Sequence, residues 1–437
     1  MPKPPELFEY VGAVHIHTKD SDGSKSHNEI IRIADSYHLD FLLFTDHMTM
    51  AHRNCEGWHG RLLSIVGYEI QDKKNENHYL AFGLDEVLPA ELSAPEYVRS
   101  VREAHGLGFI AHPDEVRKMP EARAYPWTAW GIDVFDGIEI WNHMSAWLEG
   151  LDKNSRLKSF LHPRSIIGTP SPKTLARWDE AAERRRVVGI GSLDAHAAPY
   201  RWGPFRLTLF PYKIQLQAIR THVLTETPLP IEDFRKSKEI FLGALRQANA
   251  FISNYRWGNA RGFRFWCESR RQFALMGESM SFHPSIVFRV ELPEPGKIKL
   301  ICKGRVVAET EGTSAEFPIA GDGAYRVEVL KGEKGWIYSN HIKIFPSRQR
   351  EPERPQRFEG GREVEHPKGP QKEHSGHEPR RLAPNDSNRH PKAANKPQQT
   401  APPPKPQNKG EQGQQKHPSD SRRWRRPRSQ KTEKSGQ

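Results

Sequence analysis

The chain has 437 residues, of which 36% are hydrophobic and 27% charged, and its formal net charge is +12. No segment approaches the ~18 consecutive apolar residues of a membrane-spanning helix, and the opening Met-Pro-Lys-Pro-Pro-Glu lacks the basic and then apolar pattern of a signal peptide. With three cysteines and no Cys-x-x-Cys pair, we expect a cytoplasmic protein with no disulfide framework and no membrane partner.

The first apolar segment ends in two histidines, His15 and His17, and an acidic loop follows it. Side chains two residues apart on a strand point to the same face, so both imidazoles can reach one cation. The loop can deliver Asp20 or Asp22 beside them. Taken alone this is a weak indication, because the chain contains 21 histidines.

Later apolar segments of strand length also end in residues that bind metals. They span residues 39–47, 62–69, 108–112 and 187–196 and end in His47, Glu69, His112 and the pair Asp194 and His196. Continuous apolar runs are typical of strands buried on both faces, as in parallel sheets covered by helices. Chance placement of such residues at nearly every strand end is improbable, so metal binding is the favoured interpretation.

Helical patterns alternate with these strands, at residues 28–37, 95–105 and 173–186. The first places Ile30, Ile31 and Ala34 on one stripe, with Ser26 or Asn28 available as the N-cap. Alternating strands and helices indicate βα units of an α/β fold. In a closed barrel of such units the active site forms at the C-terminal ends of the strands.

The motifs at the strand ends resemble those of the PHP family, named for polymerase and histidinol phosphatase, over about residues 10–257. In chain order they are His15-x-His17-Thr with Ser21-Asp22-Gly23, Thr45-Asp46-His47, Gly67-x-Glu69, His78 opening the next strand, Ala111-His112-Pro113 and Asp194-Ala-His196. The resemblance implies a distorted (β/α)7 barrel that holds two or three divalent metals, and most characterised members of the family hydrolyse phosphate esters.

The resemblance also implies a ligand set, and all nine of its positions are filled by residues able to bind a cation. One metal would take His15, His17, Glu69 and Asp194; a second would share Glu69 and add His78 and His112; a third would take Asp22, His47 and His196. Imidazole and carboxylate ligands suit Zn, Mn or Fe.

Phosphate esters resist hydrolysis because their oxygens repel an incoming hydroxide. Clustered divalent metals lower the pKa of bound water from 15.7 toward ~7 and clamp the attacking and leaving oxygens in line. We therefore expect a metal-dependent phosphoesterase that uses a metal-bridged hydroxide. Its substrate would be a phosphorylated small molecule, a nucleotide or an oligonucleotide, and no side chain is identified as the general acid.

Three nearby side chains allow two interpretations each. Asp46 either orients a ligand or caps a helix or loop. Lys19 either contacts a substrate phosphate or is an ordinary solvated lysine. Arg201 either makes bidentate contact with a phosphate or covers Trp202 at the surface.

Beyond residue 257 the pattern changes to strands alone, with alternating apolar and polar residues in segments 261–267, 285–292, 297–302, 324–330 and 341–345. This predicts an all-β antiparallel sandwich over residues 258–347, after a barrel over 1–257. Residues 348–437 are rich in Pro, Gln and charge, and we expect a disordered tail.

The tail has 22 Lys or Arg against 11 Asp or Glu, a net of +11 out of +12 for the chain. Its arginine-rich run 422–428 either holds nucleic acid or another polyanion or merely aids solubility. Two alternative functions follow: a nuclease tethered to nucleic acid by the tail, or a non-catalytic nucleic-acid-binding protein that uses the barrel as a platform.

Overall fold

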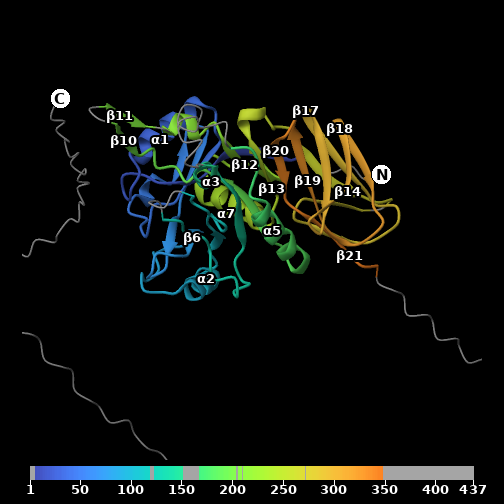
Figure 1. The fold of residues 1–437 in the computed structure, drawn as a ribbon, viewed down its shortest axis with the longest axis horizontal. Coiled ribbons are helices and arrows are strands. Elements are labelled where there is room, and N and C mark those ends of the chain that lie inside the picture. Colours follow the sequence, from blue (N-terminus) through green and yellow to red (C-terminus); the bar gives the residue numbers. More distant parts are fainter. Residues whose placement is uncertain are drawn as a thin grey trace, which may run out of the picture. The chain divides into compact units, whose positions relative to one another are not determined.

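The computed structural model of the protein describes residues 5–118, 123–150, 167–202, 205–208, 210–270 and 272–347 (Figure 1). All of them belong to one of two compact units, Met1–Gln356. The predicted tail, residues 348–437, lies outside the described residues, so its disorder stays a prediction.

The helices of the described residues are α1 (His27–Ser36), α2 (Ala94–Glu103), α3 (His143–Gly150), α5 (Pro172–Arg184), α6 (Tyr212–Gln215) and α7 (Phe234–Arg246), with 3-10 turns at Arg53–Cys55 and Tyr255–Trp257. Three of these helices, α1, α2 and α5, lie close to where the apolar periodicity places them, and the others were not predicted. Ser26 is the N-cap of α1, and its backbone N–H donates to Glu29 Oε2 at 3.0 Å, as in a capping box. Among the described residues, the structure contains no helix of the length and apolar character that would carry it through a bilayer.

The strands of the first part of the chain surround the predicted ligands. They are β1 (Phe8–Ile16), β2 (Phe41–Phe44), β3 (Gly57–His59), β4 (Leu62–Val66), β5 (Tyr68–Gln71), β6 (His78–Phe82), β7 (Leu107–Ile110), β8 (Gly137–Asn142), β9 (Val188–Ser192), β10 (Pro199–Trp202), β11 (Phe205–Thr208), β12 (Ile219–Thr225) and β13 (Ala250–Asn254). Strands β2, β4, β7 and β9 are buried along their whole length, as their continuous apolar runs predict. Strands β6 and β8 are also buried throughout.

The α/β class is confirmed, but a closed (β/α)7 barrel is not. In the described residues the strands divide into one sheet with the order β13-β12-β1-β2-β4-β3, another with the order β5-β6-β7-β8-β9, and the ribbon β10-β11. Single bridges, His47 to Glu69 and Ile16 to Ala195, connect the two larger sheets. Parallel pairing holds for β1-β2, β2-β4, β7-β8 and β8-β9. The pairs β5-β6 and β6-β7 are antiparallel, the first across a short link and the second across a longer link that contains α2.

The β-rich part continues the first sheet through β13, which pairs with β20. Its strands are β14 (Arg264–Glu268), β15 (Phe273–Leu275), β16 (Ser279–Ser281), β17 (Val287–Cys302), β18 (Arg305–Pro318), β19 (Gly323–Lys331), β20 (Lys334–Ser339) and β21 (Ile342–Phe345). Pairing is antiparallel as predicted, except that β16 and β21 run parallel. These strands enclose their own apolar core, which includes Phe288, Val327 and Trp336.

A buried ion pair joins α5 to the β-rich part. Asp179 on α5 accepts from Arg326 on β19 at 2.6 Å (Nε) and 2.9 Å (Nη2), and His341 Nε2 lies 2.8 Å from the same carboxylate. Burial alone would raise the pKa of Asp179, but these two partners lower it to about 2. The carboxylate is therefore charged and fully paired.

Replacing Arg326 with Met should lower the free energy of unfolding by roughly 3–5 kcal/mol, because the Asp179 carboxylate would stay buried without its main partner. Urea denaturation followed by circular dichroism would measure the change. Arg184→Met is the matched control, since it removes an exposed partner of Glu180 and should cost less than about 1 kcal/mol. Equal effects of the two substitutions would contradict a stabilising role for the buried pair.

Candidate metal centre

The nine predicted ligands converge from six strands and the loops at their ends. His15 lies in β1 and His17 just after it, Asp22 lies in the loop before α1, His47 follows β2, Glu69 lies in β5, His78 opens β6, His112 follows β7, and Asp194 and His196 follow β9. The predicted ligands are thus brought to one place, most of them at the carboxyl ends of strands. Glu69 is an exception, because the predicted strand 62–69 is divided into β4 and β5, and Glu69 lies at the start of β5 instead of a strand end.

Glu69 lies at the centre of this cluster and is 1% exposed. Its Oε1 lies 2.8 Å from His78 Nδ1 and 3.3 Å from His112 Nε2. Its Oε2 lies 3.2 Å from His15 Nε2, 3.3 Å from His17 Nε2 and 3.2 Å from His47 Nδ1. Both oxygens therefore face imidazole nitrogens, as a carboxylate shared by two cations would require.

Asp194 provides a second carboxylate on the same histidines. Its Oδ1 lies 3.5 Å from the Nε2 atoms of both His15 and His17, and 3.4 Å from His196 Nδ1. His15, His17 and Asp194 thus form one group of closely spaced ligand atoms, and His47, Glu69 and His78 form another.

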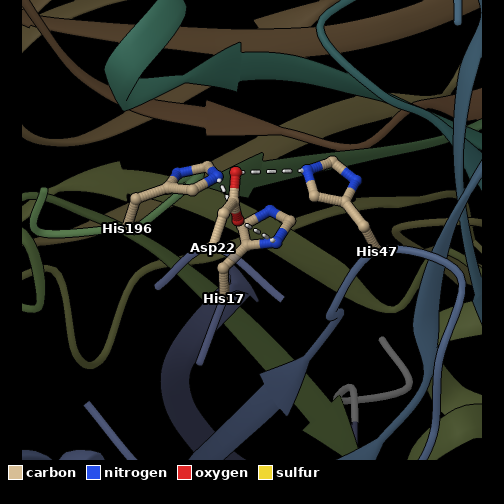
Figure 2. A group of neighbouring side chains, drawn as sticks. All are labelled: His17, Asp22, His47 and His196. Atoms are coloured by element: carbon tan, nitrogen blue, oxygen red, sulfur yellow. Dashed lines mark ion pairs between the residues drawn. The ribbon is translucent and has the colours of Figure 1, made fainter. Parts of the chain in front are cut away.

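Asp22 gathers the remaining predicted ligands at the more open side of the cluster (Figure 2). Its Oδ1 lies 3.1 Å from His196 Nε2 and 3.6 Å from His17 Nδ1, and its Oδ2 lies 3.7 Å from His47 Nε2. The side chain of Asp22 is 55% exposed, whereas that of His17 is fully buried. His17 consequently faces Asp22 with one ring nitrogen and the Glu69 and Asp194 carboxylates with the other.

The clustered charges shift the pKa values of both kinds of ligand. Burial alone would lower the pKa of His17 and of His112, but neighbouring carboxylates, Asp194 and Glu69 for the first and Glu69 for the second, raise each to about 9. Burial would likewise raise the pKa of Glu69, yet the surrounding imidazoles hold it well below its ordinary value. Burial instead lowers the pKa of His47. Without cations the centre therefore holds ionised carboxylates next to protonated imidazoles such as His17 and His112.

The donor set fits divalent cations. Among the described residues, His17 Nε2 and His47 Nδ1 are buried without a hydrogen-bond partner. A buried polar atom without a partner costs free energy, so a cation bound to these two nitrogens would remove that cost. Mixed imidazole and carboxylate groups, with no cysteine among them, suit Zn, Mn or Fe.

The backbone at several ligand positions is strained. His15, His112 and Asp194 have φ values of 65°, 28° and 53°, in the left-handed region that residues with a Cβ seldom adopt. The pairing of β1 with β2 shifts register between Val14 and Ile16. His15 and His17 therefore meet the same carboxylates through a bulge at His15, not through the regular strand alternation expected from their spacing.

Glu139, a fully buried residue of β8, contacts the predicted ligands but was not itself predicted from the sequence. Its Oε1 lies 2.7 Å from His15 Nδ1, and its Oε2 accepts from the backbone N–H of His112 at 2.7 Å and from Asn142 Nδ2 at 3.0 Å. The available signal was a single carboxylate inside an otherwise apolar strand. Together with His112, Glu139 also lines a cavity of about 290 Å³.

The sequence left two interpretations open for each of Asp46, Lys19 and Arg201, and the structure places each of these residues differently. Asp46 accepts from Thr18 N at 2.7 Å, Thr18 Oγ1 at 2.7 Å and Ser21 Oγ at 2.6 Å, which corresponds to the loop-cap alternative. Lys19 is exposed, with Nζ 3.5 Å from Glu29 Oε2, and is not part of the cluster. Arg201 lies in β10, but its side chain is outside the described part of the structure.

Binding of Zn²⁺ or Mn²⁺ near pH 7.5 should release more than one proton per chain, because His17 and His112 have a pKa of about 9 without cations and must lose their protons to bind. The affinity should accordingly weaken as the pH falls from 9 to 6. Calorimetry in buffers of different ionisation enthalpy measures the released protons. Release close to zero would mean that these histidines are already neutral in the metal-free protein.

No family model and no curated protein matches the chain, but solved structures do. A two-domain protein from Bacteroides vulgatus, described as containing a predicted PHP-like metal-dependent phosphoesterase, is 15% identical, with 77% of this chain and 95% of that chain covered and a TM-score of 0.39. A Bifidobacterium adolescentis protein with the provisional name of metal-dependent phosphoesterase is 16% identical, with 45% and 91% covered and a TM-score of 0.28.

A third match is an amidohydrolase from Chromobacterium violaceum with bound sulfate and no metal, 14% identical, with 42% and 87% covered and a TM-score of 0.26. Of these three structures, the description of the Bacteroides vulgatus protein carries the name of the family that the motifs of this chain resemble.

Proposed function

We propose that the protein is a metal-dependent phosphoesterase that hydrolyses a phosphorylated small molecule, a nucleotide or an oligonucleotide. The observation that carries this proposal is the convergence of histidines on both oxygens of one buried carboxylate, Glu69. Such a centre has no evident structural purpose, because apolar packing would stabilise the strand ends without strained backbone or buried charge.

The proposed ligands fall into three sets of side chains, of which the first two share Glu69. One cation would be held by His15, His17, Glu69 and Asp194, a second by Glu69, His78 and His112, and a third by Asp22, His47 and His196. Two or three divalent cations, Zn, Mn or Fe, would supply positive charge for the phosphate oxygens and lower the pKa of water at the site.

The surrounding residues fix the ligands. Glu139 lies 2.7 Å from Nδ1 of His15 and would keep a proton on that nitrogen, so that the proton lost on metal binding would come from Nε2, the nitrogen that faces Glu69 and Asp194. Asp46 holds the loop that carries Asp22 through Thr18 and Ser21. Lys19 and Arg201 remain candidates for contact with a substrate phosphate, Lys19 after separating from Glu29.

His15→Ala should abolish metal-dependent hydrolysis in a screen of phosphomonoesters and phosphodiesters, because it removes a ligand close to both carboxylates. Glu139→Gln should reduce the rate or the metal affinity by about 10–100-fold, since it weakens the orientation of His15 without removing a ligand. Glu149→Gln is the matched control, because Glu149 lines the same cavity and no ligand contact is assigned to it.

The preferred ester would assign the substrate class. An absence of hydrolysis above the His15→Ala background with Mn, Zn, Fe or Mg, despite bound metal, would overturn the proposal. It would favour a non-catalytic protein that binds nucleic acid and uses the fold as a platform.

The charge of the C-terminal segment supports a second candidate, a nuclease. Residues 348–437 carry +11 of the net charge, which would attract a phosphate backbone. A chain that ends at Pro346 should then hydrolyse oligonucleotides more slowly than the full chain, with the difference shrinking as salt is added, while its rate on a small ester is unchanged. Equal rates on oligonucleotides would remove the tail from substrate capture.

A further inference from the structure

A second group of metal-binding side chains lies next to the loop that carries Asp22. Asp20 belongs to this loop, His27 is the first residue of α1, and His52 precedes the 3-10 turn Arg53–Cys55. One ligand atom from each lies within 4.8 Å of the other two. His52 Nδ1 pairs with Asp20 Oδ2, and His27 Nδ1 lies 3.9 Å from the same oxygen.

His27 is the unusual member of this group. It is 3% exposed, and among the described residues its Nε2 is buried without a hydrogen-bond partner. The nearest acceptor recorded for that atom is Asp46 Oδ2 at 3.7 Å, which is beyond hydrogen-bond distance. His27 therefore faces Asp20 with Nδ1 and Asp46 with Nε2, on the other side of the ring. A carboxylate behind the ring in this way is the usual partner of an imidazole that binds a cation through its other nitrogen.

The donor types define the ligand. Two imidazoles and one carboxylate form the three-residue set that binds zinc-type divalent ions and leaves a position for water. Ligand distances of about 2.0–2.2 Å place the donors of one cation roughly 3–3.5 Å apart, so His27 and Asp20 need to approach only slightly. The side chain of His52 is 52% exposed, and it can rotate away from Asp20 to admit an ion.

We propose that Asp20, His27 and His52 form an auxiliary site for a zinc-type divalent cation, separate from the centre around Glu69. A cation there would join three chain segments: the loop at residues 18–22, the start of α1 and the turn after His52. Asp22, whose side chain is 55% exposed, lies two residues beyond Asp20. The auxiliary cation therefore fixes the loop that presents Asp22 to the main centre, and this inference does not depend on the reaction catalysed there.

Co²⁺ titration of the metal-free full chain tests the site, with bound equivalents measured by elemental analysis and ligation by visible absorption. The wild type should bind one equivalent more than His52→Ala, or bind it at least about 10-fold more tightly. His283→Ala, which removes an exposed histidine of the β-rich part, should behave as the wild type. His15→Ala should weaken the main centre and keep the auxiliary equivalent.

Hydrogen exchange provides the second readout. Exchange at residues 18–22 should slow when metal is added to the wild type, and less so in His52→Ala. Because His52 is exposed, its substitution should leave the fold intact even if His27→Gln does not fold. The same number of Co²⁺ equivalents, the same affinity and the same spectrum in His52→Ala as in the wild type would overturn the proposal and leave Asp20 and His52 as a simple ion pair.

Discussion

The centre of this protein depends on the balance of charge between one buried carboxylate and the imidazoles around it. Glu69 could not remain ionised at 1% exposure without its histidine neighbours. The pKa of His15 is in turn held above its ordinary value by Glu139, Glu69 and Asp194, against the effect of burial. Each side therefore compensates the desolvation of the other. Cations would take over the role of the protons, so the metal-free cluster is already arranged around positive charge.

Maintaining this balance imposes demands on the scaffold. The ligands come from strands that are far apart in sequence, and several of these strands are buried on both faces. Apolar packing below the cluster thus compensates the free-energy cost of the strained backbone at His15, His112 and Asp194. Hydrogen bonds accepted by Glu139 and Asp46 then determine how the imidazoles and the acidic loop are oriented.

Features that depend on neighbouring residues in the chain were predicted better than features that depend on contacts between segments far apart in the sequence. Helix α1 and its Ser26 cap follow from apolar spacing and capping chemistry, which are local. The pairing of β5, β6 and β7 depends on contacts between strands, and alternation of strands and helices could not distinguish it from a regular barrel. The sequence predicts two strands at 285–292 and 297–302, because Pro293, Pro295 and Gly296 between them indicate a turn. In the structure a single strand, β17, runs through both segments, with a register shift between Glu291 and Gly296. Glu139 was not predicted as part of the site, because a single carboxylate leaves the apolar pattern of a strand recognisable.

The pairing of β13 with β20 has a consequence for how this chain can be shortened. Phe251, Ile252 and Ser253 pair with residues 337–339, and Asn340 donates to the carbonyls of Gly189 and Ala250 at 3.0 and 2.8 Å. A chain that stopped after Trp257 would leave β13 as an uncovered, apolar edge strand, a template for aggregation. The β-rich part thus shields the sheet that carries β1, and the metal-binding part is not expected to be soluble when expressed without it.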